Sequence, residues 1–221
     1  MENHIIQDFL EKAESNYKFY SKSAKSFKLY KTDAIQFLSG CKNNMFDISI
    51  TSPPYGENAT TVPYGQFSIL ALNWIDPIDL ELEGWELENY SSIDANSLGG
   101  KAKQIKMDNY GIQLMMPYVK LISSTKQRKV IRFMNDYFMF LDELCRVSKK
   151  YIVLTLGNRT VDRVNINLTN ISKKYLEYKG FANNQILERS IPRKRTPRRT
   201  SRVGTTPVKS INSEYVIIHS K

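Results

Sequence analysis

The hydrophobic and polar positions of the chain follow two spacings, one typical of helices and one typical of strands. Apolar positions at helical spacing predict helices over 4–20, 34–38, 65–74, 130–147 and 169–178. The pattern over 130–147 is the clearest of these, because its apolar positions trace one face of the helix. Gly180 follows the final pattern and predicts the end of that helix.

Short runs rich in β-branched and aromatic residues predict strands over 27–30, 46–51, 151–156, 185–188 and 214–219. Strands therefore alternate with helices, which indicates an α/β fold with a mostly parallel sheet. The working site of such a sheet lies at the carboxyl ends of its strands. Two loops are expected there: the TSPPYG loop of residues 51–56 and the GNR loop of residues 157–159.

The length of 221 residues suits a single domain spanning 1–221. From residue 77 to about 110 the chain is acidic and then irregular, with Gly and Asn. Long irregular segments inside a compact domain are usually functional loops. We therefore interpret 77–125 as an insertion, which either reads the target or acts as a lid.

Composition excludes several classes of protein. Hydrophobic residues make up 41% and charged residues 24%, as in a folded globular chain. No apolar run is long enough for a membrane span, and the N-terminus lacks the apolar core of a secretory signal, so we expect a cytoplasmic protein. Cys41, Cys145, His4 and His219 are its only cysteines and histidines, and they are scattered. This pattern excludes a zinc site, a disulfide framework and the usual Ser-His or Cys-His catalytic arrangement.

Positive charge is concentrated near the C-terminus. The net charge is +10, and eight basic residues without an acid lie between 189 and 213, which leaves +2 for the rest. These residues are Arg189, Arg193, Lys194, Arg195, Arg198, Arg199, Arg202 and Lys209. Such a block favours a polyanionic partner, nucleic acid above all, and the alternative is a solvated surface that binds nothing. Prolines 192, 197 and 207 argue against a membrane-bound amphipathic helix there.

The TSPPYG loop carries the clearest chemical signal. Two consecutive prolines fix the backbone and donate no N–H, so the loop is stiff and presents unpaired carbonyl groups. Carbonyls and the Ser52 hydroxyl can accept both N–H groups of an exocyclic amine. Tyr55 adds a face on which a base can stack, worth about 1–3 kcal/mol. Because the loop holds no strong base or nucleophile, it fits a reaction in which the substrate nitrogen itself attacks an activated methyl group.

These residues resemble a known family. The segment KLYKTDAIQFL at 28–38, followed by FDISITSPPYG at 46–56, is similar to the amino-methylating DNA methyltransferases of restriction–modification systems. The resemblance extends through YIVLTLGNRTVD, ERSIPRKR and SEYVIIHSK, and so covers nearly the whole chain. It implies the Rossmann-like sheet of S-adenosyl-L-methionine-dependent methyltransferases and methylation of double-stranded DNA. The TSPPY form is commonest among enzymes that methylate the N4 amine of cytosine.

The resemblance also implies a role for each site residue. Ser52 and the Pro53 carbonyl would hold the target amine, Pro54 would complete the stiff corner, and Tyr55 would pack on a flipped base. Asp33 would hydrogen-bond the cofactor, although Thr32 stands where the family commonly has Gly. Thr51, Gly157 and Asn158 would border the same cleft. DNA phosphates would meet Arg189, Arg193, Lys194, Arg195, Arg198 and Arg199.

Some of these residues also have a purely structural interpretation. Asp33 precedes the helix predicted over 34–38 and could cap it. Gly157 and Asn158 could form a simple turn at the end of a strand. The aromatic residues Tyr137, Phe138 and Phe140 are at helical spacing, and we interpret them as core rather than as a stacking platform.

One part of the family pattern is missing. The family binds the methionine moiety of its cofactor with a glycine-rich loop after a strand, but no G-x-G occurs among the ten glycines of this chain. We therefore expect a partial sheet that lacks the glycine-rich cofactor strand. Three explanations stay open: a second polypeptide that supplies this strand, a lone chain whose cofactor pocket has departed from the pattern, or truncation of a longer reading frame.

The sequence thus predicts one subunit of an S-adenosyl-L-methionine-dependent DNA methyltransferase that acts on the N4 amine of cytosine, with a second subunit as partner. Two alternatives remain. One is methylation of the N6 amine of adenine, and the other is a non-catalytic DNA-binding subunit in which the TSPPY sequence is only a structural turn.

Overall fold

The computed structural model describes residues 32–55, 104–190, 199–203, 206–209 and 213–221, and positions 11, 12, 14, 15, 18, 28, 30 and 74. The chain divides into two units, Met1–Asp33 and Ala34–Lys221. No helix in these described ranges is long and apolar enough to cross a membrane.

The N-terminal unit matches its predicted helix and not its predicted strand. Described positions between 11 and 18 are helical and exposed, in agreement with the helix predicted over 4–20. Lys18 Nζ lies 2.7 Å from Glu14 Oε1, one helical turn away. Lys28 and Tyr30 are not in a strand, so the strand predicted over 27–30 is wrong at these two positions. A strand requires a hydrogen-bonded neighbour, which a short apolar run alone does not provide.

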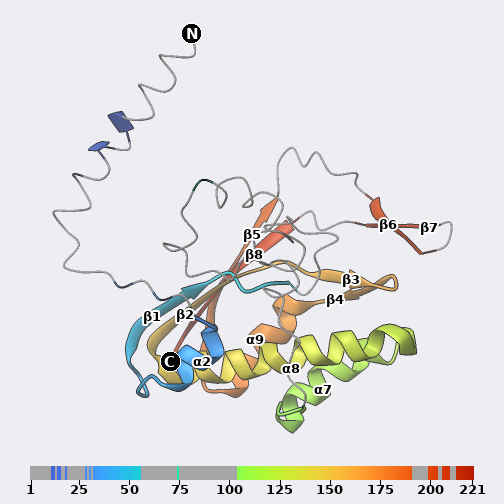
Figure 1. The fold of residues 1–221 in the computed structure, drawn as a ribbon, viewed down its shortest axis with the longest axis horizontal. Coiled ribbons are helices and arrows are strands. Elements are labelled where there is room, and N and C mark those ends of the chain that lie inside the picture. Colours follow the sequence, from blue (N-terminus) through green and yellow to red (C-terminus); the bar gives the residue numbers. More distant parts are fainter. Residues whose placement is uncertain are drawn as a thin grey trace. The chain divides into compact units, whose positions relative to one another are not determined.

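The larger unit is built on a four-stranded sheet (Figure 1). Its strands, in spatial order, are β1 (Phe46–Thr51), β2 (Ser148–Leu156), β8 (Ser213–Ser220) and β5 (Ala182–Ser190). β1 pairs with β2 in parallel, whereas β8 is antiparallel to both β2 and β5. The α/β class is therefore confirmed. Among the described strands β1, β2 and β5 run in the same direction, as a mostly parallel sheet requires, and β8 lies between β2 and β5 with the opposite direction.

Four helices lie together below the sheet in Figure 1: α2 (Ala34–Ser39), α7 (Asn109–Val119), α8 (Ser124–Val147) and α9 (Leu168–Tyr178). Phe138 and Leu141 of α8 and Ile171 and Tyr175 of α9 are buried against Leu154 of β2 in one hydrophobic core. The aromatic residues of the 137–140 run are thus core or partly buried against it, as predicted.

Three helical predictions need correction. α8 begins six residues before the predicted 130, because its first turns, Ser124–Lys129, are polar and carry no apolar period. α7 lies inside the segment 77–125, and its Met115 and Val119 are buried in the core. This helix was not predicted, and the interpretation of 77–125 as an insertion that reads the target or acts as a lid stays a prediction. Trp74 lies in a turn and is 90% exposed, so the buried helix predicted over 65–74 is wrong at its end.

Local signals explain where the other elements end. Asn167 caps α9 by accepting a hydrogen bond from the Asn170 N–H at 2.9 Å. Gly180 has φ 89°, a left-handed conformation that favours glycine and ends the helix as predicted. Two short hairpins were not predicted. They are β3 (Arg159–Val161) with β4 (Val164–Ile166), and β6 (Arg199–Val203) with β7 (Thr206–Lys209).

The two faces of the sheet differ in what covers them. The closed face, which the helices cover, carries Ile152, Leu154 and Leu156 of β2 and Ile217 and His219 of β8, all of them 0% exposed. On the opposite face, which we call the open face, several apolar side chains are accessible. Its residues include Ile48 and Ile50 of β1, Tyr151 of β2 and Leu187 of β5, which are 52, 74, 40 and 45% exposed.

Candidate active site

The TSPPYG loop leaves the sheet at the carboxyl end of β1. Thr51 is the last residue of the strand and pairs with Leu154 of β2. Pro53 is buried, and it separates two exposed residues, Ser52 and Pro54. The stiff corner is thus anchored by one proline, while the hydroxyl of Ser52 is accessible to a ligand.

The Tyr55 ring packs against the loop that follows β2. A Cβ atom placed on Gly157 would lie 2.8 Å from both Cδ2 and Cε2 of Tyr55, which is closer than real side chains approach. Only glycine therefore allows the ring to lie where it does. The structure brings together the two loops that the sequence predicted at the carboxyl ends of the strands, and it leaves Tyr55 half-buried.

A carboxylate from β8 holds the other end of Tyr55. The Tyr55 hydroxyl donates to Oε1 of Glu214 at 3.5 Å, and Oε2 of Glu214 forms an ion pair with Arg189 of β5. Sequence reasoning missed Glu214, which lies 159 positions from Tyr55. The only available signal was its place at the start of a predicted strand, and the pairing of β8 between β2 and β5 could not be read from the chain.

Asn158 has a structural role in this arrangement. Its side-chain oxygen accepts hydrogen bonds from the backbone N–H and the hydroxyl of Thr169, both at 3.1 Å. These bonds tie the GNR loop to the first turn of α9. The next residue, Arg159, is 2% exposed, and its guanidinium lies 5.3 Å from the centre of the Phe133 ring. The loop is thus firmly packed, and the part of Asn158 in cofactor binding stays a prediction.

Asp33 directly precedes α2 and is exposed. It is the last residue of the N-terminal unit, so it is described apart from the TSPPYG loop. Both interpretations of this residue, as a helix cap and as a cofactor ligand, stay predictions.

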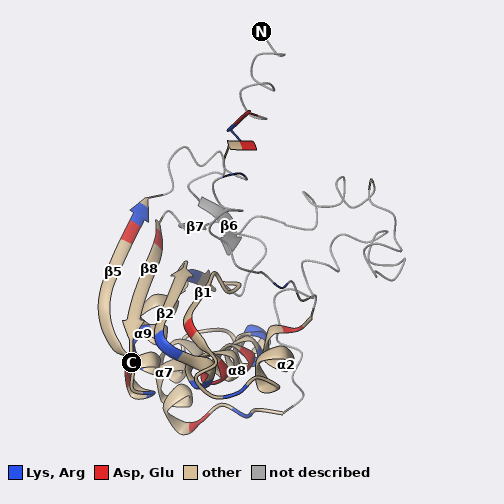
Figure 2. Ribbon diagram, turned by 90° about the vertical axis from the view of Figure 1, so that its left-hand side faces the viewer, with Lys and Arg blue, Asp and Glu red and all other residues tan. Residues whose placement is uncertain are grey.

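The basic segment is described only in part. Figure 2 shows basic and acidic positions beside each other at the carboxyl end of β5. Arg189 is the basic residue of this strand, and its side chain is 73% exposed while paired with Glu214. Arg199 begins β6. Arg193, Lys194, Arg195 and Arg198 lie outside the described residues. Contact of these six residues with DNA stays a prediction.

The buried ionisable groups nearest this sheet are ill suited to catalysis. Burial, followed by the charge of Asp142, raises the pKa of the Cys145 thiol to about 12, so it stays protonated and unreactive. Burial and the nearby Lys173 lower the pKa of His219 to about 4, so its ring is neutral at ordinary pH. His219 is covered on the closed face of the sheet and has no access to a substrate. The candidate site therefore rests on hydroxyl, carbonyl and aromatic groups.

Comparison with known proteins gives one informative match. The chain is 34% identical to the Type II methyltransferase M.MvaI of Kocuria varians over 195 residues. The matched region covers 80% of this chain and 40% of that protein. The chain thus spans well under half the length of the curated relative it matches. No model of a known protein family matches the chain.

Solved structures give weaker matches. Two structures of a candidate DNA modification methylase from Thermus thermophilus each share 14% identity with the chain, with TM-scores of 0.41 and 0.39. The matches cover 89 and 86% of this chain and 55 and 53% of those chains, and the second structure is a complex with S-adenosyl-L-methionine.

Proposed function

We propose that this chain is the target-amine half of a DNA methyltransferase of a restriction–modification system, which methylates the N4 amine of cytosine. One observation carries the proposal: the TSPPYG loop stands at the carboxyl end of β1, with Ser52 exposed and the Tyr55 ring held against Gly157. The similarity to a Type II methyltransferase supports the same reaction class.

The proposed chemistry uses the groups of the loop directly. The Ser52 hydroxyl and the Pro53 carbonyl accept the two N–H bonds of the base's amine, which orients the nitrogen lone pair towards the methyl donor. The ring of Tyr55 stacks on the flipped base and is kept in place by Gly157 below and Glu214 at its hydroxyl. No residue of the loop has to serve as a nucleophile.

The cofactor is S-adenosyl-L-methionine, which when bound supplies a methyl group activated by a positively charged sulfur. The described residues fit only part of such a site. Thr51 ends β1 beside the loop, but Gly157 is covered by the Tyr55 ring and the Asn158 oxygen is engaged by Thr169. No glycine-rich loop of the G-x-G kind occurs in the sequence.

We propose that a second polypeptide supplies the rest of the cofactor site. One feature of the sheet supports this. Within the described part of the chain β1 pairs with β2 alone, and Ile48 and Ile50 stay accessible on the open face. An additional strand on β1 would satisfy its free backbone groups, and a helix joined to that strand would cover these side chains on the open face.

The test is to replace Tyr55 or Ser52 by Ala in the native host and to measure methylated nucleosides of its DNA by mass spectrometry. We expect N4-methylcytosine with the natural chain and its loss with Tyr55→Ala, because the base loses its stacking partner. Ser52→Ala should give a strong reduction, since one acceptor for the amine is gone. Gly40→Ala is a suitable control, because its added Cβ would meet only the Phe37 carbonyl oxygen at 3.5 Å.

The same measurement distinguishes the alternatives. N6-methyladenine in place of N4-methylcytosine would move the proposal to the adenine class. Unchanged N4-methylcytosine in the Tyr55→Ala strain would leave this loop without a catalytic role, and the chain would then be a DNA-binding subunit.

A further inference from the structure

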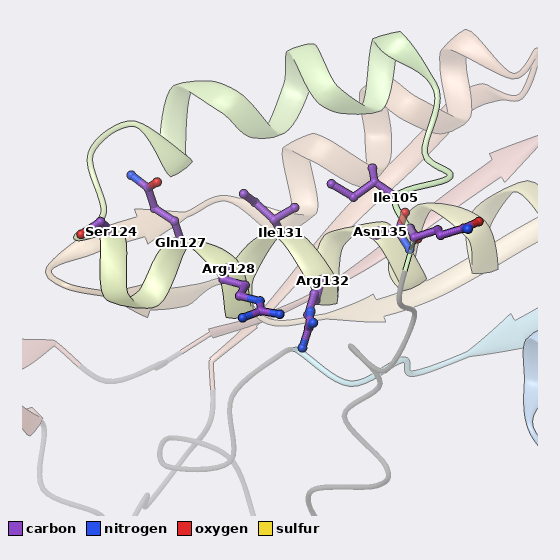
Figure 3. Close-up of a pocket in the computed structure, with 8 residues that line it drawn as sticks. Ile105, Ser124, Gln127, Arg128, Ile131, Arg132 and Asn135 are labelled. Atoms are coloured by element: carbon purple, nitrogen blue, oxygen red, sulfur yellow. Dashed lines mark hydrogen bonds between the residues drawn. The ribbon is translucent and has the colours of Figure 1, made fainter.

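A cavity of about 390 Å³ lies against the N-terminal half of α8, away from the TSPPYG loop residues described above. Arg128 and Arg132 lie on its wall, together with Ser124, Gln127, Ile131 and Asn135 (Figure 3). The two arginines are four positions apart, so they lie one above the other on the helix. Figure 3 shows both side chains extending from the same side of α8.

The charge of this cavity is unbalanced. Lys126 pairs with Asp162, Arg146 with Glu143, Lys179 with Asp108 and Asp142, and Arg189 with Glu214. In the part of the chain that the structure describes, neither Arg128 nor Arg132 has such a carboxylate partner. The remaining residues of the wall are neutral. Two guanidinium groups in a cavity whose lining residues include no Asp or Glu favour an anionic ligand.

Other polar groups of the wall are occupied in building it. The Asn135 side-chain oxygen accepts from the backbone N–H groups of Lys106 and Met107, at 2.6 and 3.2 Å. The Gln127 amide donates to the carbonyls of Val119 and Ile122, at 3.1 and 2.9 Å. The walls are therefore fixed by internal hydrogen bonds, while the two arginines remain for a ligand.

Hydrogen bonds near both ends of α8 place its N-terminal half away from the start of β1. The C-terminal end of α8 is close to the start of β1, since the Arg146 carbonyl accepts from the Asn44 N–H at 2.9 Å. Its N-terminal end is close to the hairpin that follows β2, since the Ser123 N–H donates to Asp162, in the turn between β3 and β4, at 3.1 Å. Arg128 and Arg132 lie within about 14 Å of that N-terminal end, at a rise of about 1.5 Å per residue.

We propose that Arg128 and Arg132 form a binding site for backbone phosphate of the DNA whose base enters the candidate active site. The proposal rests on the proposed function and adds to it a contact outside the basic segment 189–209. Arginine forks match phosphate oxygens bidentately, and such contacts fix the register of the duplex without reading its sequence.

The experiment measures binding of a 20-base-pair duplex to the complete enzyme at several salt concentrations. The test variant is the double substitution Arg128→Gln, Arg132→Gln. Its matched control is Lys129→Gln, Lys149→Gln, which removes the same charge from exposed positions outside the cavity. Each lost phosphate contact lowers the slope of log K against log salt by about 0.9. We expect a slope shallower by about two in the test variant and affinity about tenfold weaker at moderate salt, with the control close to the natural protein.

Equal slopes for the two double variants would overturn the proposal. A test variant that binds DNA normally but unfolds at a lower temperature would also overturn it, because the arginines would then serve an acidic segment of the chain itself, such as the acids between 76 and 88. Methylation by the same preparations tests the proposed function separately. Normal methylation with equal slopes removes only the phosphate site, whereas lost DNA binding by the natural enzyme removes both proposals.

Discussion

The closed and open faces of one sheet behave as two different surfaces. On the closed face Ile152 of β2 is 0% exposed against the helices, while on the open face Ile50 of β1 is 74% exposed. Both are isoleucines within strands of the same parallel pair, and Ile152 pairs with Ser49, the residue before Ile50. Burial of such a side chain is worth about 1.5–3 kcal/mol, which the closed face gains and the open face does not.

On the proposal that this chain is the target-amine half of an enzyme, this difference explains how such a half can have a stable fold. The closed face has a complete core of α7, α8 and α9 with β2 and β8. The open face offers apolar side chains and, within the described residues, the unpaired side of β1. On the proposal made above, burial on the closed face stabilises the fold of this chain, and the open face binds the polypeptide that completes the cofactor site.

The largest expected effect compares the two isoleucines directly. Ile152→Ala should lower the free energy of unfolding by about 2–5 kcal/mol, because it leaves a cavity under the helices. Ile50→Ala in the isolated chain should cost about 1 kcal/mol or less, because the side chain is already in water. Denaturant unfolding of both variants measures the difference. Equal losses would mean that the open face is covered within the chain itself.

A second prediction uses the pH dependence of stability to test whether the closed face excludes water from His219. Burial lowers the pKa of His219 to about 4, so below its ordinary value of 6.5 the unfolded chain binds a proton that the folded chain does not. The free energy of unfolding is therefore unaffected by this residue above about pH 7. As the pH falls from 6.5 towards 4, the free energy of unfolding decreases by about 3 kcal/mol in total. His219→Gln should remove that slope. An unchanged slope in the variant would place the titration elsewhere.

The smallest expected effect concerns the point where Tyr55 and the GNR loop meet. Gly157→Ala should displace the Tyr55 ring, since the new Cβ would lie 2.8 Å from two ring atoms. We expect methylation to fall by about ten- to a hundredfold with a stability change of about 1 kcal/mol or less. Steady-state methylation and thermal unfolding measure the two effects, with Gly40→Ala as the control. Normal methylation by the Gly157 variant would show that the ring position does not matter.

Sequence patterns predicted the closed face better than the rest of the fold. The strand Phe46–Thr51 has the predicted bounds, and α9 differs from its prediction by one residue. The helix α9 has apolar spacing that burial enforces, since Ile171, Tyr175 and Leu176 are buried, whereas β1 was predicted from its β-branched residues although none of its side chains is buried. The first turns of α8 are polar and exposed, so no spacing marked them. α7 was missed because Gly111 and Pro117 lie within it, and both usually interrupt helices.

The candidate site was predictable to the extent that it depends on local sequence. The TSPPYG and GNR loops were expected at one end of the sheet, and the contact of Tyr55 with Gly157 agrees with that. The contact of Tyr55 with Glu214 was not predictable, because it depends on the antiparallel entry of β8 beside β2. The charge of Arg128 and Arg132 was also overlooked, since these residues are part of a helix whose overall charge is mixed.

The most direct test of the central claim is calorimetric titration of the purified single chain with S-adenosyl-L-methionine. If the chain is the target-amine half, it should unfold cooperatively and yet give no measurable binding, because the glycine-rich part of the cofactor site is supplied by a partner. Binding in the micromolar range by the single chain would contradict the account, since the chain would then hold a complete cofactor site of its own.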